Sequence, residues 1–335
     1  MGPEDRLEES RAKIHAPFAL DDTMRFYSPQ DNLDALEHPR VRSFTRFVRR
    51  TYEPDLPPGE AIALLIPCTK HKPYSVSIEH RRINGALLRA GFEPAGDVRP
   101  PDALYDVLER REDPEVLNAA PLVRRGRIVH RFVVSEPLAL VPYEHIYTWR
   151  GGQSPAASYD DPGLFEHRGT SVAPWRSDCT ATPIGSDGRW RWGDNERMAY
   201  VQVHNRLSRS IAETLSRLAH RYTRRVAWVA PGLTHRSFML ADGERTREKV
   251  PRSRRVGRGR EPLFGVNDLV PELVEVRPTR SETEAALNRL AIRLRGADPS
   301  TTDRAILAVY ARGGGGATPL ALPELLERLV DTLTR

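Results

Sequence analysis

The sequence predicts an α/β protein with a layered core: a mainly parallel sheet flanked by helices, plus a small helical C-terminal region. Three apolar runs predict buried strands, at residues 61–66, 128–135 and 225–230. Stretches with helical periodicity lie between these runs. Strands that alternate with helices are typical of a parallel sheet, whose crossover connections are helical.

Residues 1–58 are expected to form an N-terminal leader with one amphipathic helix. Between residues 39 and 52, Val41, Phe44, Phe47 and Val48 fall on one helical face, and arginines fall on the other. Prolines at positions 54, 57 and 58 end this helix before the first strand.

Residues 59–241 are expected to form the α/β core. After the first strand, Ser77 is a suitable N-cap for a short helix that carries Ile83 and Leu87. The stretch from 151 to 193 is rich in Gly, Pro, Ser and Trp without clear periodicity, which predicts a long loop region. A helix over 196–222 then precedes the third strand.

Residues 242–262 are expected to form a basic linker, and residues 263–335 a helical C-terminal region. Positions 245–260 hold eight Lys or Arg residues and one acid, which predicts a mobile, solvated connector. Helical patterns follow at 282–295, 302–312 and 323–334.

Charge and cysteine content limit the functional classes. The net charge is +6, and nearly all of the base is arginine, which favours partners that carry phosphate. A genome that prefers arginine codons is the alternative explanation. Two cysteines exclude a disulfide framework and a Cys-rich zinc site, so we expect no metal and no cofactor. The chain has no apolar run long enough to cross a bilayer and no apolar signal core, so we expect a cytoplasmic protein without a membrane partner.

Reactive side chains gather directly after the first strand. Cys68 ends this strand and is followed by Lys70, Lys72 and His80. Positive charge near a thiol lowers its pKa and increases its nucleophilicity, and a histidine can move protons near neutral pH. A half-buried structural cysteine and surface lysines are equally compatible with the sequence alone.

The spacing of this segment resembles the signature of the archaeosine synthase family: Pro-Cys, three residues, Lys-Pro-Tyr, two residues, Ser, two residues, His. The matching positions are Pro67, Cys68, Lys72, Pro73, Tyr74, Ser77 and His80. The segment Ser135–Pro142 is similar to a second family segment, with Ala139 where the family has glycine. Residues 183–185, 190 and 194–196 look like a degraded third segment, so the resemblance covers about 38–235.

The resemblance implies an enzyme that adds an amine, such as lysine, to the nitrile of 7-cyano-7-deazaguanine in tRNA, giving an amidine. For this reaction we expect Cys68 as nucleophile, His80 as proton shuttle and Lys72 as a further catalytic residue. The candidate substrate-binding residues are Lys70, Tyr74, Ser77, Ser135, Glu136, Asp194 and Glu196. Archaeal members carry additional N-terminal and C-terminal domains, so this chain resembles a stand-alone catalytic core, for which DNA, a nucleoside or a free base is an alternative substrate.

The basic linker offers contacts to nucleic acid through phosphate. Its candidate residues are Arg252, Arg254, Arg255, Arg258 and Arg260. Tryptophans in the expected loops offer base stacking or, equally, core packing. Two other functional classes stay open at this point. One is a non-catalytic nucleic-acid-binding protein; the other is a 7-deazaguanine DNA-modification or base-exchange enzyme, with Asp194 or Glu196 near the sugar.

Overall fold

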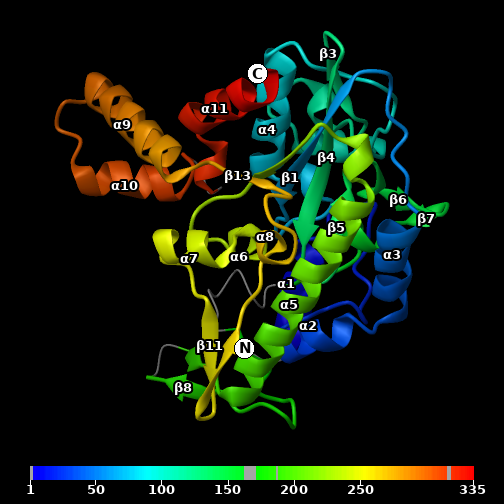
Figure 1. Ribbon diagram of the computed structural model, residues 1–335, viewed down its shortest axis with the longest axis vertical. Helices are drawn as coiled ribbons and strands as arrows, with labels where there is room; N and C mark the ends of the chain where they lie inside the picture. The colour runs from blue at the N-terminus through cyan, green and yellow to red at the C-terminus, as the bar shows by residue number, and fades with distance from the viewer. Residues whose placement is uncertain (1–2, 162–170, 186–187, 315–317) are drawn as a thin grey trace.

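A seven-stranded sheet forms the centre of the molecule (Figure 1). The computed structural model describes residues 3–161, 171–185, 188–314 and 318–335. Across the sheet the strand order is β13–β10–β1–β4–β3–β2, and β5 pairs with the other part of β4. The strands are β1 (Glu60–Pro67), β2 (Glu93–Pro94), β3 (Leu122–Arg124), β4 (Arg127–Ser135), β5 (Ala139–Pro142), β10 (Arg224–Trp228) and β13 (Glu275–Arg277).

The sheet is mixed and mostly parallel, which confirms the predicted fold class. Strands β13, β10, β1 and β4 run parallel, whereas β2, β3 and β5 are antiparallel to their neighbours. The three expected strands are β1, β4 and β10, and they lie side by side with β1 in the middle. Their carboxyl ends therefore meet at one edge of the sheet, where open α/β folds place their ligands.

Alternate residues of β1 face two separate apolar cores. Ile62 and Leu64 pack in one core with helices α4 (Ile78–Arg89) and α11 (Pro323–Thr334). Ala63 and Leu65 pack in the other with α5 (Asp194–Arg217) and α6 (Thr234–Met239). Because both faces of the strand are covered, its sequence is a continuous apolar run rather than an alternating one.

The N-terminal segment belongs to the core. The expected amphipathic helix is α3 (Pro39–Arg50). Of its predicted apolar residues, Val41, Phe44 and Val48 are buried in the same cluster as Ile62, and Phe47 packs against that cluster partly buried. Two further helices, α1 (Pro3–Ala12) and α2 (Pro29–Ala35), were not predicted. The α1 sequence has no apolar stripe, so periodicity gives no signal for it.

The expected basic linker has regular structure instead. Residues 242–262 form helix α7 (Asp242–Glu248) and an antiparallel hairpin of β11 (Ser253–Val256) and β12 (Gly259–Pro262). Its charges find partners: the buried Arg245 donates to the Leu240 carbonyl, and the Arg254 guanidinium lies 4.9 Å from the Tyr200 ring centre on α5. Carbonyl oxygens and aromatic faces can satisfy guanidinium groups, so this segment forms regular structure although it is strongly polar.

The expected loop region of 151–193 contains short ordered pieces. Its described residues include three small strands. Strand β7 (Gly152–Gln153) pairs with β6 (Thr148–Trp149), which precedes the region, and β8 (Thr182–Ile184) pairs with β9 (Arg189–Arg191). Residues 162–170 and 186–187 lie outside the described residues. Turns of 3-10 helix span Tyr74–Val76, Asp102–Val107, Pro114–Leu117, Tyr143–His145, Pro155–Ala157, Ala219–Arg221 and Pro319–Ala321.

The C-terminal region is helical, as predicted. After the short helix α8 (Val266–Leu269), helices α9 (Arg280–Ala297), α10 (Asp303–Ala311) and α11 match the three expected helical stretches. Leu325 and Leu329 of α11 close the first core, whereas α9 and α10 project to one side of the sheet (Figure 1). No described helix is long and apolar enough to cross a membrane.

Candidate active site

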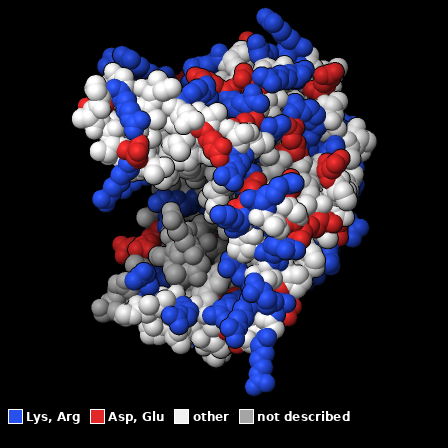
Figure 2. All heavy atoms as spheres, turned by 60° about the vertical axis from the view of Figure 1, so that its left-hand side comes forward, with Lys and Arg blue, Asp and Glu red and all other residues white. Residues whose placement is uncertain are grey.

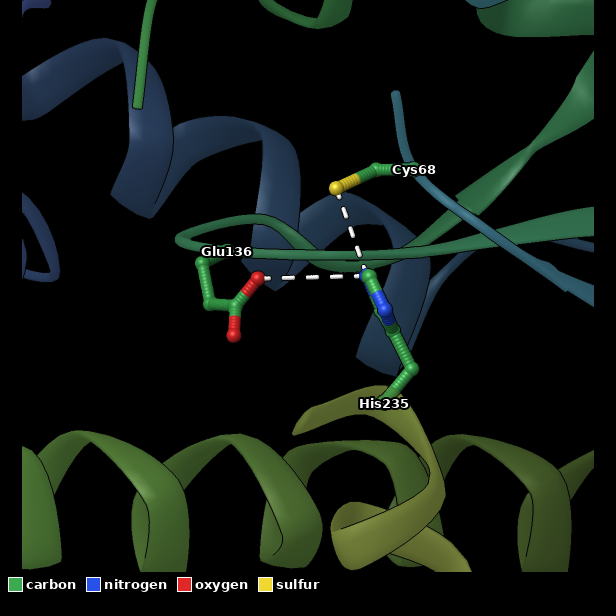
Figure 3. Close-up of side chains that lie close together, drawn as sticks. All are labelled: Cys68, Glu136 and His235. Atoms are coloured by element: carbon green, nitrogen blue, oxygen red, sulfur yellow. Dashed lines mark hydrogen bonds and ion pairs between the residues drawn. The ribbon is translucent and has the colours of Figure 1, made fainter. Parts of the chain in front are cut away.

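Three reactive side chains meet where the central parallel strands end (Figure 3). Cys68 directly follows β1, Glu136 directly follows β4, and His235 lies in α6, seven residues beyond the end of β10. The Cys68 amide donates to the Val134 carbonyl at 2.9 Å, which continues the β1–β4 pairing to the site. The fold therefore brings together residues from three distant parts of the chain.

The Nε2 atom of His235 is the centre of this group. It lies 3.3 Å from Sγ of Cys68 and 3.9 Å from Oε2 of Glu136. Both neighbours face the same ring nitrogen, unlike a Ser-His-Asp triad, in which the acid and the nucleophile contact different nitrogens. The three ligand-type atoms lie within 4.8 Å of one another, so these residues could also hold a metal ion.

Cys68 is a protonated thiol rather than a preformed thiolate. Burial raises its pKa above the ordinary value, the Glu136 charge adds to this, and Lys72 opposes it. The sequence predicted a pKa lowered by nearby positive charge; the structure reverses this because desolvation of the thiolate outweighs the attraction to Lys72. The thiol therefore needs a base before it can act as a nucleophile.

His235 is the group positioned to accept that proton, although its lowered pKa makes it a weak base. Burial lowers its pKa to about 3, and the nearby charges of His80 and Lys72 act in the same direction. The imidazole is therefore neutral at neutral pH, and its Nε2 atom can accept the Cys68 proton. The pair is a neutral thiol beside a neutral imidazole, a common arrangement for an activated nucleophile.

Glu136 carries a buried carboxyl group beside Cys68 and His235. Its pKa is raised well above the ordinary value by burial and by the negative charge of Asp161, and Lys72 partly opposes this. Neither carboxylate oxygen has a hydrogen-bond partner among the described residues, although the side chain is fully buried. Such a group is costly unless a bound molecule or ion satisfies it.

Lys72 lies beneath the site rather than on the surface. It is buried, its Nζ donates to the Thr69 carbonyl at 2.7 Å, and it lies 4.4 Å from the centre of the Tyr159 ring. The Tyr74 and Tyr159 hydroxyls lie 2.9 Å apart, and each bonds to Oγ of Ser135. This network joins the Pro67–His80 segment to the Ser135–Pro142 segment.

His80 fixes the backbone beside Cys68. Its Nε2 atom donates to the Pro67 carbonyl at 2.9 Å, and its Nδ1 atom is 3.1 Å from the Tyr143 hydroxyl. Burial lowers its pKa to about 4. With both nitrogens engaged, its contacts are those of a positioning residue, and it is His235, not the predicted His80, that contacts the thiol. Ser77 caps α4 by accepting from the His80 amide, as predicted.

The remaining predicted substrate-binding residues lie apart from this network. Lys70 is exposed. Asp194 is paired with Arg197 at the start of α5. Glu196 accepts from the Gly193 amide, the Thr180 amide and hydroxyl, and Gln30, so its carboxylate is fully used in capping α5. These contacts engage both carboxylate oxygens of Glu196.

The five predicted nucleic-acid arginines all lie on or next to the β11–β12 hairpin. Arg252 is paired with Asp242, and Arg254 lies over Tyr200. Arg255, Arg258 and Arg260 are exposed. Figure 2 shows basic side chains scattered over one face, with acidic ones between them, around a hollow in the surface. Of the tryptophans for which base stacking or core packing was open, Trp149 packs beside Phe44 and Trp192 beside Tyr200, whereas Trp175 is exposed.

Comparisons with family models, curated proteins and solved structures find no match to this chain. The evidence for its chemistry is therefore the geometry of the site. Sequence reasoning missed His235, Asp161 and Tyr159, which adjoin the predicted residues. His235 had a usable signal: Pro231-Gly232 ends the third predicted strand, and the same strand-end argument that selected Cys68 applies to the residues after it.

Proposed function

We propose that this protein is an amidine-forming enzyme similar to archaeosine synthase, which adds a primary amine such as lysine to the nitrile of 7-cyano-7-deazaguanine in nucleic acid, with tRNA as the first candidate. The observation that carries the proposal is the contact of Cys68 Sγ with His235 Nε2 at 3.3 Å, at the strand edge where the signature residues gather. A nitrile carbon is an electrophile that a base-activated thiol can attack.

In the first step the sulfur of Cys68 forms a bond to the nitrile carbon while its proton passes to Nε2 of His235. One carbon–nitrogen bond of the nitrile opens, and His235 gives the proton to the nitrile nitrogen. The product is a thioimidate, and His235 is neutral again. Because the pKa of His235 is low, its protonated form is a strong acid and gives the proton readily to the nitrile nitrogen.

In the second step the amine nitrogen attacks the thioimidate carbon, the carbon–sulfur bond breaks, and the sulfur regains a proton as the amine nitrogen loses one. The amine arrives as an ammonium ion, which must first lose a proton. Glu136 is the candidate acceptor, because its raised pKa makes its carboxylate a stronger base than an exposed one and neither oxygen has another partner among the described residues.

The backbone at Ala139 supports the resemblance independently of the site. The family has glycine at this position of the second segment, and Ala139 has a φ of +61°. This left-handed region favours glycine because it has no Cβ. The local conformation is thus the one that the family residue would adopt without strain.

The experiment compares Cys68→Ala with Cys179→Ala on tRNA that carries 7-cyano-7-deazaguanine. Mass spectrometry of the nucleosides should find the amine adduct with wild-type protein and with Cys179→Ala, and none with Cys68→Ala. Equal product from Cys68→Ala would sink the thioimidate route. Intact tRNA binding by all three proteins without any product would favour the non-catalytic nucleic-acid-binding alternative, and release of free base would favour base exchange.

A further inference from the structure

A second property of the Cys68, Glu136 and His235 group is the chemistry of its donor atoms. A thiol sulfur and a carboxylate oxygen from the ends of β1 and β4 converge with an imidazole nitrogen from helix α6, and the three atoms lie within 4.8 Å of one another (Figure 3). These are the three donor types that zinc binds in proteins, and catalytic sites commonly use three protein ligands with the fourth position open. A sulfur ligand also disfavours magnesium and calcium, which prefer oxygen.

The distances fit a tetrahedral ion. With zinc–sulfur at about 2.3 Å and zinc–nitrogen and zinc–oxygen at about 2.0–2.2 Å, tetrahedral donor atoms lie roughly 3.3–3.6 Å apart. The observed separations are 3.3 Å between sulfur and Nε2 and 3.9 Å between Nε2 and Oε2. No pair of the three donor atoms is more than 4.8 Å apart, so the Glu136 carboxylate must move towards the other two donors to close the site around an ion.

The unused carboxylate of Glu136 is an independent sign of a missing ligand. Both oxygens are buried and have no hydrogen-bond partner within the described part of the chain. A cation placed between Glu136, Cys68 and His235 would satisfy one or both. A thiolate and a carboxylate also neutralise the two charges of the ion, which limits the cost of burying it. Of the neighbouring charged groups, the negative Asp161 attracts a bound cation and the positive Lys72 repels it.

We propose that Cys68, Glu136 and His235 form a zinc site, and that zinc bound there holds the Cys68 thiol unreactive. Binding exchanges the thiol proton for a sulfur–zinc bond and releases that proton to solvent. The fourth position stays open to water. The inference goes beyond the proposed function: zinc and the nitrile carbon compete for the same sulfur, so zinc acts as a reversible block.

The test uses the full chain, stripped with a chelator and dialysed against a limiting free zinc concentration. The expected result is one zinc per chain, and with cobalt in place of zinc, a thiolate-to-cobalt charge-transfer band. Cys68→Ser and His235→Ala should each weaken binding by more than about 100-fold, beyond the 10- to 100-fold that loss of an outer-shell partner costs. Cys179→Ser is the matched control and should bind as wild type. Binding that survives Cys68→Ser would overturn the site.

A second readout needs no variant and so does not depend on folding of one. Iodoacetamide should alkylate Cys68 in the stripped wild-type protein, and one equivalent of zinc should protect it while Cys179 keeps its reactivity. Unchanged alkylation of Cys68 with zinc present contradicts the proposal. The two proposals fail separately: amidine formation without zinc binding removes only the zinc site, and zinc binding without amidine formation by the stripped protein removes only the proposed enzyme.

Discussion

The Sγ atom of Cys68 and the Nε2 atom of His235 lie 3.3 Å apart, although 167 positions separate the two residues in the chain. The parallel pairing of β1 with β10 produces this contact, because it aligns the carboxyl ends of the two strands. Cys68 follows the first strand directly, and the short helix α6 carries His235 back over the end of the second. His235 contacts the thiol, whereas the buried His80 contacts the Pro67 carbonyl and the Tyr143 hydroxyl.

His235→Gln should lower amidine formation by about 10²–10⁴-fold, the usual contribution of a general base. The reason is that the Cys68 pKa is raised by burial, so the thiol stays protonated without a proton acceptor beside it. The measurement is the rate of product formation on tRNA bearing the nitrile base, together with the rate of Cys68 alkylation. Both rates should fall in parallel.

His80→Gln is the matched comparison, because Gln Nε2 can still donate to the Pro67 carbonyl. We expect a smaller loss of rate than for His235→Gln and little change in Cys68 alkylation. If His80→Gln instead removed alkylation and His235→Gln left it intact, His80 would be the proton shuttle after all.

Ala139→Gly should stabilise the protein by about 1 kcal/mol. A left-handed backbone costs a non-glycine residue roughly 1–2 kcal/mol, and glycine gives back part of this through the greater entropy of its unfolded chain. The residue has a φ of +61° and pairs with Ser135 at the turn between β4 and β5. Urea unfolding measures the change.

Ala139→Val is the opposing control at the same site, since a branched side chain is still less tolerant of positive φ. It should destabilise the protein. A stabilising valine would show that packing, rather than backbone strain, governs this position.

The stability of the protein should depend on pH partly through His80. Burial lowers its folded-state pKa to about 4, whereas an unfolded histidine takes up a proton near pH 6.5. Between these values the unfolded state binds more protons, so this contribution is fully present above pH 6.5 and is lost as the pH falls towards 4. His80→Gln should therefore reduce the slope of unfolding free energy against pH by about 1.4 kcal/mol per unit in this window.

Denaturant unfolding at several pH values between 4.5 and 7 checks this, with the exposed His220→Gln as control. The control reports the general effect of replacing a histidine on the surface. Equal slopes for wild type and His80→Gln would mean that His80 takes up its proton in the folded state as easily as in the unfolded one.

Much of the fold could be read from the sequence, since stretches rich in apolar residues predicted β1, β4 and β10, and periodicity predicted α3, α9, α10 and α11. Local patterns of this kind depend on neighbours in the chain. Helix α1 and the β11–β12 hairpin were missed because they do not carry such a local apolar pattern. Their polar side chains are stabilised by distant partners: Arg6 of α1 donates to the Val172 carbonyl, and Arg254 lies over Tyr200.

The site was only partly predicted, because some of its properties also depend on distant parts of the chain. Spacing within one segment marked Cys68, Lys72 and His80, but it could not show that desolvation would raise the thiol pKa or that the His80 nitrogens would both be engaged. Those facts depend on burial and on long-range pairing. The predicted charge effect of Lys72 is present and correct in sign, and it is outweighed.

Arg255 and Arg258 should contribute to binding of nucleic acid, because they are exposed on the β11–β12 hairpin, whereas Arg252 and Arg254 are held by Asp242 and Tyr200. Changing both to Gln should weaken binding of tRNA and reduce the slope of log affinity against log salt by about 2, since each phosphate contact adds somewhat less than one. Changing the exposed Arg280 and Arg304 of α9 and α10 to Gln removes the same charge elsewhere. Titrations at several salt concentrations separate the two cases: an equal loss in both double variants would mean that net charge, and not the hairpin, attracts the nucleic acid.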